Sequence, residues 1–400
     1  MTAPRLGELN PPPRILLGPG PSNVDPRVYR ALLAPVLGHL DPDFLQIMDD
    51  VQVLLRRLFQ TSNRLAFPVS GTGSAGMETA MCNCLEPGDT AIITDAGYFG
   101  ARLVEMARRT GAEVIALESR PGTAVEPQQA RDAARGKKIK VLGVTHGETS
   151  TGVAHNLADF RQVADECGAL LVVDAVATVG GMPLKVDEER IDVCFTGSQK
   201  CLSAPPGLAP FTAGARAEEA FRQRKTKVTS WYFDLTYIMK YWGGERTYHH
   251  TAPISMVYAL REALRLIDEE GLEARWERHL RHQRALVAGL EAMGLELLVA
   301  PAQRMTTVSA VRVPAGVEDA KIRGRLMEEF NIEIAGGIGE LKGRIWRIGT
   351  MGSSCTANNV LLLLGALEKC LLEESFKLPP GGGVAAAAQN YAQTPATAAP

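Results

Sequence analysis

Short apolar runs alternate along this chain with longer stretches that are rich in alanine and charged residues. The runs, several of them β-branched, lie at 65–69, 91–94, 113–117, 141–145, 170–174, 192–196 and 209–213. Such alternation is typical of an α/β fold, in which crossover helices connect the strands of a parallel sheet and cover its faces. The sequence therefore predicts a large domain with a mostly parallel sheet flanked by helices.

A second, smaller unit follows this alternation. Helical patterns at 255–269 and 273–293 lead into strand patterns near 295–299, 306–313, 331–335 and 344–349, with further helices at 317–329 and 356–373. These elements predict an N-terminal arm at 1–22, a large domain at 23–270 and a smaller α+β C-terminal domain at 271–376. Residues 377–400, rich in Gly, Ala and Pro, are expected to form a disordered tail because they offer little apolar surface for a core.

Composition argues against several kinds of partner. A formal net charge of −2 leaves no broad basic surface for nucleic acid, and no run of 18 apolar residues predicts a membrane span. The seven cysteines are scattered without paired C-x-x-C spacing, which predicts no metal site and a reducing, cytoplasmic compartment. The histidine pairs at 249–250 and 279–282 are expected to lie on solvated faces.

Two chemically active residues follow neighbouring apolar runs. Asp174 ends the run at 170–174, and Lys200 comes shortly after the run at 192–196. Ligand sites of open α/β sheets gather at the carboxyl ends of the strands. An acid and a lysine at that edge fit pyridoxal 5'-phosphate (PLP), which needs a lysine amine for its aldehyde and an anionic partner for its protonated ring nitrogen. A plain Asp–Lys ion pair, or two unrelated residues, fits the spacing equally well.

A glycine-rich loop, Gly71-Thr72-Gly73-Ser74-Ala75-Gly76, follows the first strand pattern and opens a helix, as in dinucleotide-binding folds. Taken alone, the motif favours NAD, and Asp95 stands where the ribose-binding acid of such a fold is expected. However, about 64 residues precede the first strand, and an NAD site would leave Asp174 and Lys200 without a role. Free N–H groups at a helix N-terminus also suit a phosphate, so the loop can hold the phosphate of PLP instead.

A series of motifs between about residues 14 and 373 carries a family resemblance. They are LLGPGPSN at 16–23, SGTGSAGMET at 70–79, GYFG at 97–100, HGETSTG at 146–152, VDAVATVGG at 173–181, GSQKCLSAPPG at 197–207, YHHTAP at 248–253 and WRIGTMG at 346–352. In this order they resemble the class V aminotransferases of PLP fold type I, most closely the alanine–glyoxylate and serine–pyruvate (serine–glyoxylate) enzymes. The resemblance implies PLP as cofactor and a homodimer with shared active sites.

The resemblance also implies roles for individual residues. Those implied to bind the cofactor are Thr72, Gly73, Ser74, Phe99, Thr149, Asp174, Gln199, Lys200, Tyr248 and Thr251. Among them, Lys200 is the catalytic lysine, Asp174 pairs with the pyridinium nitrogen, and Phe99 stacks on the ring. Tyr248 and Thr251 are implied to reach the phosphate bound by the second subunit. Arg347 and Gly20 are implied to bind substrate, with Arg347 holding the carboxylate through its planar fork; a structural salt bridge is the alternative for Arg347.

The implied reaction is transamination between a small amino acid, alanine or serine, and glyoxylate, which yields glycine and pyruvate or hydroxypyruvate. Members that act on (S)-ureidoglycine are also similar, but amide residues are expected in them at the positions of His39 and Tyr248, which favours alanine or serine here. A lyase such as a cysteine desulfurase is the remaining alternative. It needs a nucleophilic cysteine ahead of Arg347, and residues 300–346 contain none.

Overall fold

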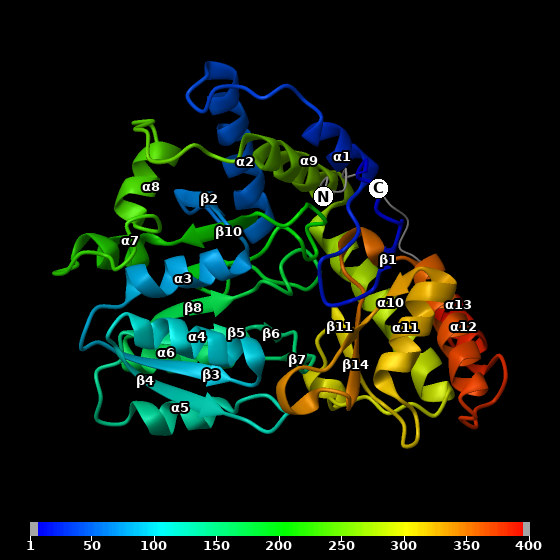
Figure 1. The fold of residues 1–400 in the computed structure, drawn as a ribbon. Coiled ribbons are helices and arrows are strands. Elements are labelled where there is room, and N and C mark those ends of the chain that lie inside the picture. The colour runs from blue at the N-terminus through cyan, green and yellow to red at the C-terminus, as the bar shows by residue number, and fades with distance from the viewer. Residues whose placement is uncertain (1–6, 395–400) are drawn as a thin grey trace, which may run out of the picture.

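The computed structural model describes residues 7–394; residues 1–6 of the expected arm and 395–400 of the expected tail lie outside it. Seven strands form the central sheet in the order β2-β10-β9-β8-β5-β3-β4 (Figure 1). They are β2 (Leu65–Ser70), β3 (Thr90–Asp95), β4 (Glu113–Glu118), β5 (Val141–Thr145), β8 (Leu170–Asp174), β9 (Val193–Phe195) and β10 (Leu208–Ala213). Only β10 runs antiparallel to its neighbours, which confirms the mostly parallel sheet.

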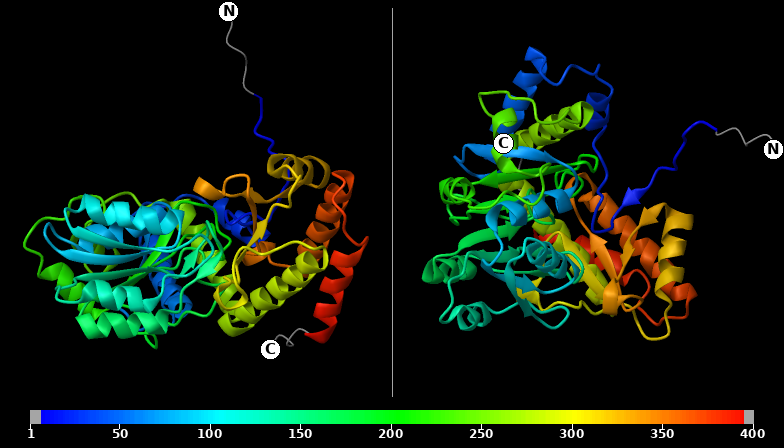
Figure 2. Two further views of the ribbon diagram at one scale, coloured as in Figure 1. Left: turned by 90° about the horizontal axis from the view of Figure 1, so that it is seen from below. Right: turned by 60° about the vertical axis from the view of Figure 1, so that its left-hand side comes forward.

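Helices lie on both faces of this sheet (Figure 2). They are α1 (Pro26–Leu32), α2 (Pro42–Phe59), α3 (Gly73–Cys84), α4 (Tyr98–Arg109), α5 (Pro127–Ala134), α6 (Leu157–Cys167), α7 (Ala215–Arg222), α8 (Leu235–Trp242) and α9 (Ile254–Glu270). Every residue of β5, β8 and β10 is buried as a result, which explains why these strands are continuous apolar runs. Helices α1 and α2 both begin with Asp-Pro, where the aspartate caps the first turn and the proline sets its backbone.

A smaller α+β unit with its own hydrophobic core packs beside the large one. Its sheet has the order β11-β14-β13, and a short parallel pair joins β1 near the N-terminus to β12. The elements are β1 (Ile15–Leu16), α10 (Leu272–Ala292), β11 (Val308–Arg312), α11 (Asp319–Phe330), β12 (Ile332–Glu333), β13 (Ala335–Gly336), β14 (Ile345–Gly349) and α12 (Ala357–Glu373). The strand expected at 295–299 is reduced to one bridge, between Leu297 and Val311.

The disorder expected for the tail is wrong for the described residues 377–394. They include a helix, α13 (Gly382–Gln393), which packs along α10 and α12 (Figure 1). Small residues allow this approach: a Cβ on Gly289 of α10 would lie 2.8 Å from the carbonyl oxygen of Gly383. The Tyr391 hydroxyl also lies 2.8 Å from Nδ1 of His282. A composition that resembled low complexity therefore forms a close helix contact.

The solvated faces expected for the two histidine pairs are also wrong. His279 and His282 are 0% and 5% exposed, because His279 accepts a hydrogen bond from the Gly352 amide and His282 contacts Tyr391 of α13. His249 is 6% exposed and stacks on Trp231 at 4.6 Å between ring centroids. Within residues 7–394, no helix has the length and apolar character needed to cross a membrane.

Candidate active site

Asp174 and Lys200 lie at the same edge of the central sheet. Asp174 is the last residue of β8 and stands opposite Phe195, the last residue of the neighbouring strand β9. The chain then turns and reaches Lys200 five residues later. Both residues therefore lie at the carboxyl ends of parallel strands, where open α/β sheets bind ligands.

Lys200 is buried beside the N-terminal segment. Its Nζ donates a hydrogen bond to the carbonyl oxygen of Pro19. A Cβ on Gly20 would lie 2.6 Å from that Nζ, and Gly20 has φ +101°, so both the space and the backbone require glycine. Burial, together with a smaller effect of the nearby Arg347 charge, lowers the pKa of Lys200 to about 8. The neutral fraction of the amine near neutral pH is therefore much larger than for an exposed lysine, as a nucleophile or base requires.

Asp174 is a buried carboxylate without a cation. Its Oδ1 accepts one hydrogen bond, from the Val176 amide at 2.9 Å. Burial raises its pKa to about 7, and the negative charge of Glu148 adds to the shift. Within the described part of the chain neither Asp174 nor Lys200 has an ion-pair partner inside 4.0 Å, so they do not form the simple ion pair considered above. A cationic ring nitrogen placed beside Asp174 would offset the cost of its charge.

The glycine-rich loop forms the N-terminus of α3, a helix of 12 residues whose N-cap Thr72 makes no side-chain capping bond. The first amides of the helix are therefore available to an anion. Gly73 lies against the segments that follow β8 and β9, since a Cβ there would meet Val176 at 2.9 Å and Gly197 at 3.7 Å. Gln199 contributes a buried side-chain oxygen without a hydrogen-bond partner. The free amides of α3 therefore suit a phosphate, and the nearby ends of β8 and β9 suit the ring attached to it.

The same loop does not fit a dinucleotide fold. It follows β2, which is an edge strand paired only with the antiparallel β10. The dinucleotide fingerprint instead follows a central parallel strand. The NAD interpretation is therefore not supported.

Phe99 is held by a buried acid, Glu148, from the short strand β6 (Gly147–Glu148). It lies in the first turn of α4, whose N-cap is Gly97 and has no side chain for capping. The Glu148 carboxylate accepts hydrogen bonds from the amides of Phe99 at 3.1 Å and Gly100 at 2.9 Å and so replaces the cap. Thr149 follows in the chain and is 4% exposed. The aromatic ring and the threonine are thus brought to one corner of the site.

Arg347 enters the site from β14 of the smaller unit. Its Nε donates to the Gly336 carbonyl oxygen at 2.8 Å and its Nη1 to the Thr149 carbonyl oxygen at 3.3 Å. No carboxylate of residues 7–394 lies within 4.0 Å of this guanidinium, so the structural salt bridge is not observed. Burial lowers the pKa of Arg347, as expected for a cation that lacks an anionic partner.

Tyr248 and Thr251 are not brought to the phosphate loop of the same chain by any hydrogen bond. Tyr248 is 55% exposed, and its hydroxyl lies 3.4 Å from Oγ1 of Thr251. Their segment is tied to the large unit by the 2.6 Å contact between His250 Nε2 and Ser70 Oγ. Both side chains are exposed to solvent.

Comparison with known proteins identifies the family. The family model described as aminotransferase class-V matches residues 27–340. The chain belongs to the class V aminotransferases. Like the other members, this aminotransferase uses PLP.

Relatives of known name resemble the chain over nearly its whole length. The (S)-ureidoglycine–glyoxylate transaminase of Bacillus subtilis is 43% identical over 96% of this chain and 97% of its own. The alanine–glyoxylate aminotransferase of Rattus norvegicus is 41% identical over 91% of this chain and 89% of its own. The crystal structure of alanine–glyoxylate aminotransferase from Nostoc sp. superposes with a TM-score of 0.90 at 46% identity, covering 92% of this chain and 97% of that one.

The structure adds residues to this aminotransferase site that the sequence interpretation missed. Glu148 is one, and its signal was a glutamate in HGETSTG together with a helix that begins at an uncapped glycine. Ser22 donates from Oγ to the Lys200 carbonyl oxygen at 2.7 Å. Arg275, fully buried on α10, donates to the carbonyl oxygens of Cys201 at 2.6 Å and Gly180 at 3.0 Å. These contacts hold the backbone around Lys200.

Cysteine chemistry has no support in this site. Cys355 follows Arg347, and burial raises the pKa of its thiol to about 12, which leaves almost no thiolate at neutral pH. Within the described residues, no group of three or more His, Cys, Asp or Glu side chains is arranged to hold a metal ion.

Proposed function

We propose that this aminotransferase transfers the amino group of a small L-amino acid, alanine or serine, to glyoxylate. The observation that carries the proposal is the buried guanidinium of Arg347, whose hydrogen bonds within residues 7–394 go to neutral carbonyl oxygens and whose charge lowers the pKa of Lys200. A cation in this position suits the single carboxylate shared by alanine, serine, glyoxylate and pyruvate. A substrate with one carboxylate needs no second cation in the site, whereas a dicarboxylic substrate would require one.

Lys200, Asp174 and Arg347 are proposed to have separate roles in the reaction. PLP supplies, when bound, an aldehyde carbon that carries the amino group and a ring that withdraws electrons. Lys200 Nζ removes the proton from the substrate Cα and returns a proton in the second half-reaction, for which a pKa lowered by burial is suited. Asp174 holds the ring nitrogen in its protonated form. Arg347 fixes the carboxylate, so the Cα–H bond faces the amine.

The donor is proposed on narrower grounds. Alanine and serine differ by one hydroxyl, which an apolar pocket discriminates weakly. His39 and Tyr248, the two positions where the ureidoglycine enzymes are expected to carry amides, pack together with ring centroids 4.8 Å apart. Because the two rings are in contact, a substitution at one position changes the surroundings of the other. We therefore propose that His39 and Tyr248 affect donor choice together.

Ureidoglycine is the second candidate donor. Its support is the 43% identity to a transaminase named for that substrate, over 96% of this chain. The exchange of one donor for the other leaves the roles of Lys200, Asp174 and Arg347 unchanged.

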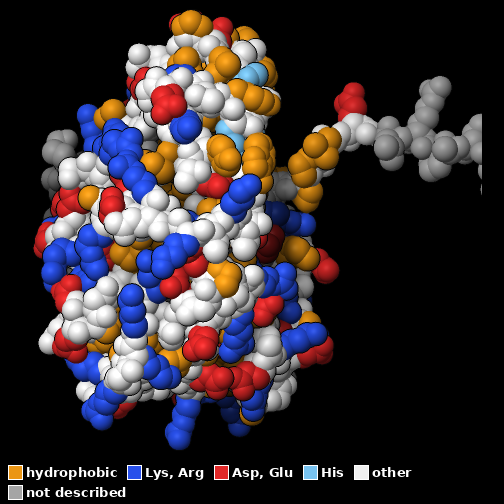
Figure 3. Space-filling model, turned by 90° about the vertical axis from the view of Figure 1, so that its left-hand side faces the viewer, with side chains coloured by type: hydrophobic (Ala, Val, Ile, Leu, Met, Phe, Trp, Pro, Cys, Tyr) orange, Lys and Arg blue, Asp and Glu red, His pale blue; other side chains and the backbone are white. Residues whose placement is uncertain are grey.

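A homodimer with shared sites is also part of the proposal. Exposed hydrophobic side chains and histidines gather at the top of the face in Figure 3, over the segment ahead of α2. Leu33 and Val36, which precede α2 in the chain, are 84% and 70% exposed, and Tyr248, whose ring contacts that of His39, is 55% exposed. Apolar surface of this kind supports a protein contact, and a contact there would deliver Tyr248 and Thr251 to the second subunit's phosphate.

Two further assignments rest on more general features. We propose a cytoplasmic location because all seven cysteines are free thiols. We also propose the division into an arm at 1–22 and domains at 23–270 and 271–376, supported by separate apolar cores. Burial of Leu17 in the core of the smaller unit attaches the end of the arm to that unit.

The test is a half-reaction assay. Purified PLP-loaded protein is mixed separately with alanine, serine and ureidoglycine, and loss of the visible absorbance of bound PLP is followed; glyoxylate or pyruvate is then added to restore it. Conversion by alanine or serine with recovery by glyoxylate is expected, and Lys200→Ala should abolish it. Failure of every donor would refute the proposal. Conversion by ureidoglycine alone would favour the second candidate, and His39→Asn with Tyr248→Asn should then leave donor preference unchanged.

A further inference from the structure

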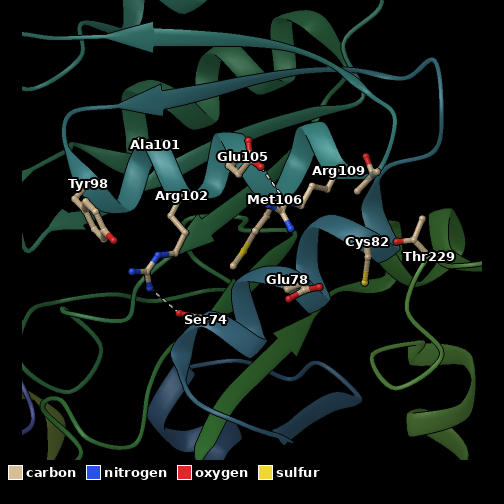
Figure 4. A pocket seen from close by; sticks show the side chains of 11 residues that line it. Ser74, Glu78, Cys82, Tyr98, Ala101, Arg102, Glu105, Met106, Arg109 and Thr229 are labelled. Carbon is tan, nitrogen blue, oxygen red and sulfur yellow. Dashed lines mark hydrogen bonds and ion pairs between the residues drawn. The ribbon is translucent and has the colours of Figure 1, made fainter.

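Arg102 connects two parts of the site that the family resemblance treats separately. It lies on α4, one turn after Phe99, and its Nη1 donates to Ser74 Oγ at 2.8 Å (Figure 4). The centre of its guanidinium lies 5.0 Å from the centroid of the Phe99 ring and 5.1 Å from that of Tyr98. One side chain thus contacts the phosphate loop and the aromatic residue expected to stack on the cofactor.

The phosphate loop has no charge of its own. Thr72, Gly73, Ser74 and Gln199 are neutral, and so are Tyr248 and Thr251. The phosphate of PLP carries close to two negative charges at neutral pH, comparable to a phosphorylated side chain. The N-terminus of α3 supplies about half a positive charge. Most of the negative charge of the phosphate is therefore not compensated by the loop.

Arg102 is available to provide that charge. No carboxylate in the part of the chain that the structure describes lies within 4.0 Å of its guanidinium. Arg102 and Arg109 both line a cavity between α3 and α4 (Figure 4), but Arg109 is paired with Glu105 at 2.9 Å. The Arg102 charge opposes the larger effect of burial on the pKa of Asp174 and acts in the same direction as burial on the pKa of Lys200, so its field reaches the centre of the site.

We propose that Arg102 is a positioning residue for the cofactor phosphate and acts through Ser74. A serine hydroxyl has one proton and two acceptor sites. Because Arg102 donates to Ser74 Oγ, the hydroxyl proton is free to point away from the guanidinium and donate to a phosphate oxygen. A hydrogen bond polarised in this way by a cation is stronger than one from an isolated serine. The inference rests on the proposed position of the phosphate at residues 72–74.

The test compares PLP with pyridoxal, which lacks the phosphate. Dissociation constants of both are measured for the cofactor-free protein, wild type and R102M, by quenching of intrinsic fluorescence. R102M is expected to weaken PLP binding about tenfold or more, the loss of one charge-assisted hydrogen bond, and pyridoxal binding less than about threefold. R102K, which keeps the charge, should recover part of the loss. R109M is the matched control and should bind both compounds as the wild type does.

A double-mutant cycle tests whether the effect passes through Ser74. In an S74A background the additional loss of PLP affinity on R102M should fall below about threefold, because the intermediate hydroxyl is gone. Equal losses of affinity for PLP and pyridoxal in R102M would overturn the inference. They would mean that Arg102 only supports the Phe99 ring. Unchanged PLP binding in R102M would overturn it as well. If R102M does not fold, R102K takes its place, with a loss confined to PLP expected and an equal loss for both compounds refuting it.

The same data separate this inference from the proposed site. If wild-type protein binds PLP no more tightly than pyridoxal, and S74A changes neither, the phosphate does not lie at residues 72–74 and the proposed position fails. If wild type prefers PLP and S74A reduces the preference while R102M does not, only the role of Arg102 fails.

Discussion

Replacement of Asp174 by asparagine is expected to stabilise the cofactor-free protein while it abolishes the function of the loaded enzyme. The carboxylate is buried without a cationic partner, so the empty site bears the cost of its charge above neutral pH. Asparagine has nearly the same shape, and its side-chain oxygen can still accept the hydrogen bond from the Val176 amide. The substitution therefore removes the charge and little else.

The magnitude follows from the pKa of Asp174, which burial raises from 3.8 to about 7. A carboxyl whose folded-state pKa is raised stabilises the fold fully below the unfolded value, and that contribution is lost as pH rises through the folded value. Each pKa unit corresponds to about 1.4 kcal/mol, so wild type should lose about 3 kcal/mol of stability from this group between pH 5 and pH 8. D174N should lose none of it.

The assay is thermal unfolding of cofactor-free wild type and D174N between pH 5 and pH 8. Every other titrating group is common to both proteins and cancels in the difference. The stability of D174N relative to wild type should increase with pH and level off above about pH 7. In the PLP-loaded enzymes the order should reverse at pH 8, because only the carboxylate balances the ring cation, and half-reaction rates of D174N should fall by at least about a hundredfold. A stability difference independent of pH would show that Asp174 keeps an ordinary pKa and would refute the reasoning.

Three further predictions concern the other active-site residues. Capture of PLP by cofactor-free protein requires the neutral amine of Lys200, so its rate should rise with pH to a midpoint near 8, and a midpoint near 10 would contradict the effect of burial. Arg347→Lys should raise the KM for the amino donor about 10- to 100-fold with a smaller change in kcat, since a lysine cannot bind a carboxylate bidentately; equal changes would contradict a binding role. Gly20→Ala, which places a methyl group 2.6 Å from Lys200 Nζ, should reduce the capture rate about tenfold or more without unfolding the protein, as measured by stopped-flow absorbance and circular dichroism.

The sequence predicted the central sheet well because its signals are local. Continuous apolar runs such as 170–173 can be recognised as buried strands without knowledge of their neighbours, and ligands of such sheets bind at the carboxyl ends of the parallel strands. Asp174 and Lys200 could therefore be placed together before the structure was known. The family of the chain followed from motifs around these same residues.

The errors occur where burial depends on a distant segment. A run of alanines at 385–388 has no apolar pattern, yet it lies in α13, where Gly289 of α10 and Gly383 of α13 allow close approach. His279 and its arginine neighbours have the spacing of a solvated face, but α10 carries them into the junction between the two units. A helix with polar residues on several faces gives no sign of which face will be covered.

Lys200, the proposed catalytic residue, depends both on its local sequence and on distant segments. Its identity follows from the chain around it, but its environment comes from three remote segments: Ser22 binds its carbonyl oxygen, Arg275 binds the next one, and the Ser353 amide binds Ser203 Oγ at 2.7 Å. The first two of these segments belong to the arm and to α10, and the third follows β14. Because these contacts hold the lysine buried against Gly20, they produce the lowered pKa that its chemistry needs. A motif can thus identify the residue that reacts, whereas its reactivity depends on how the two units are packed together.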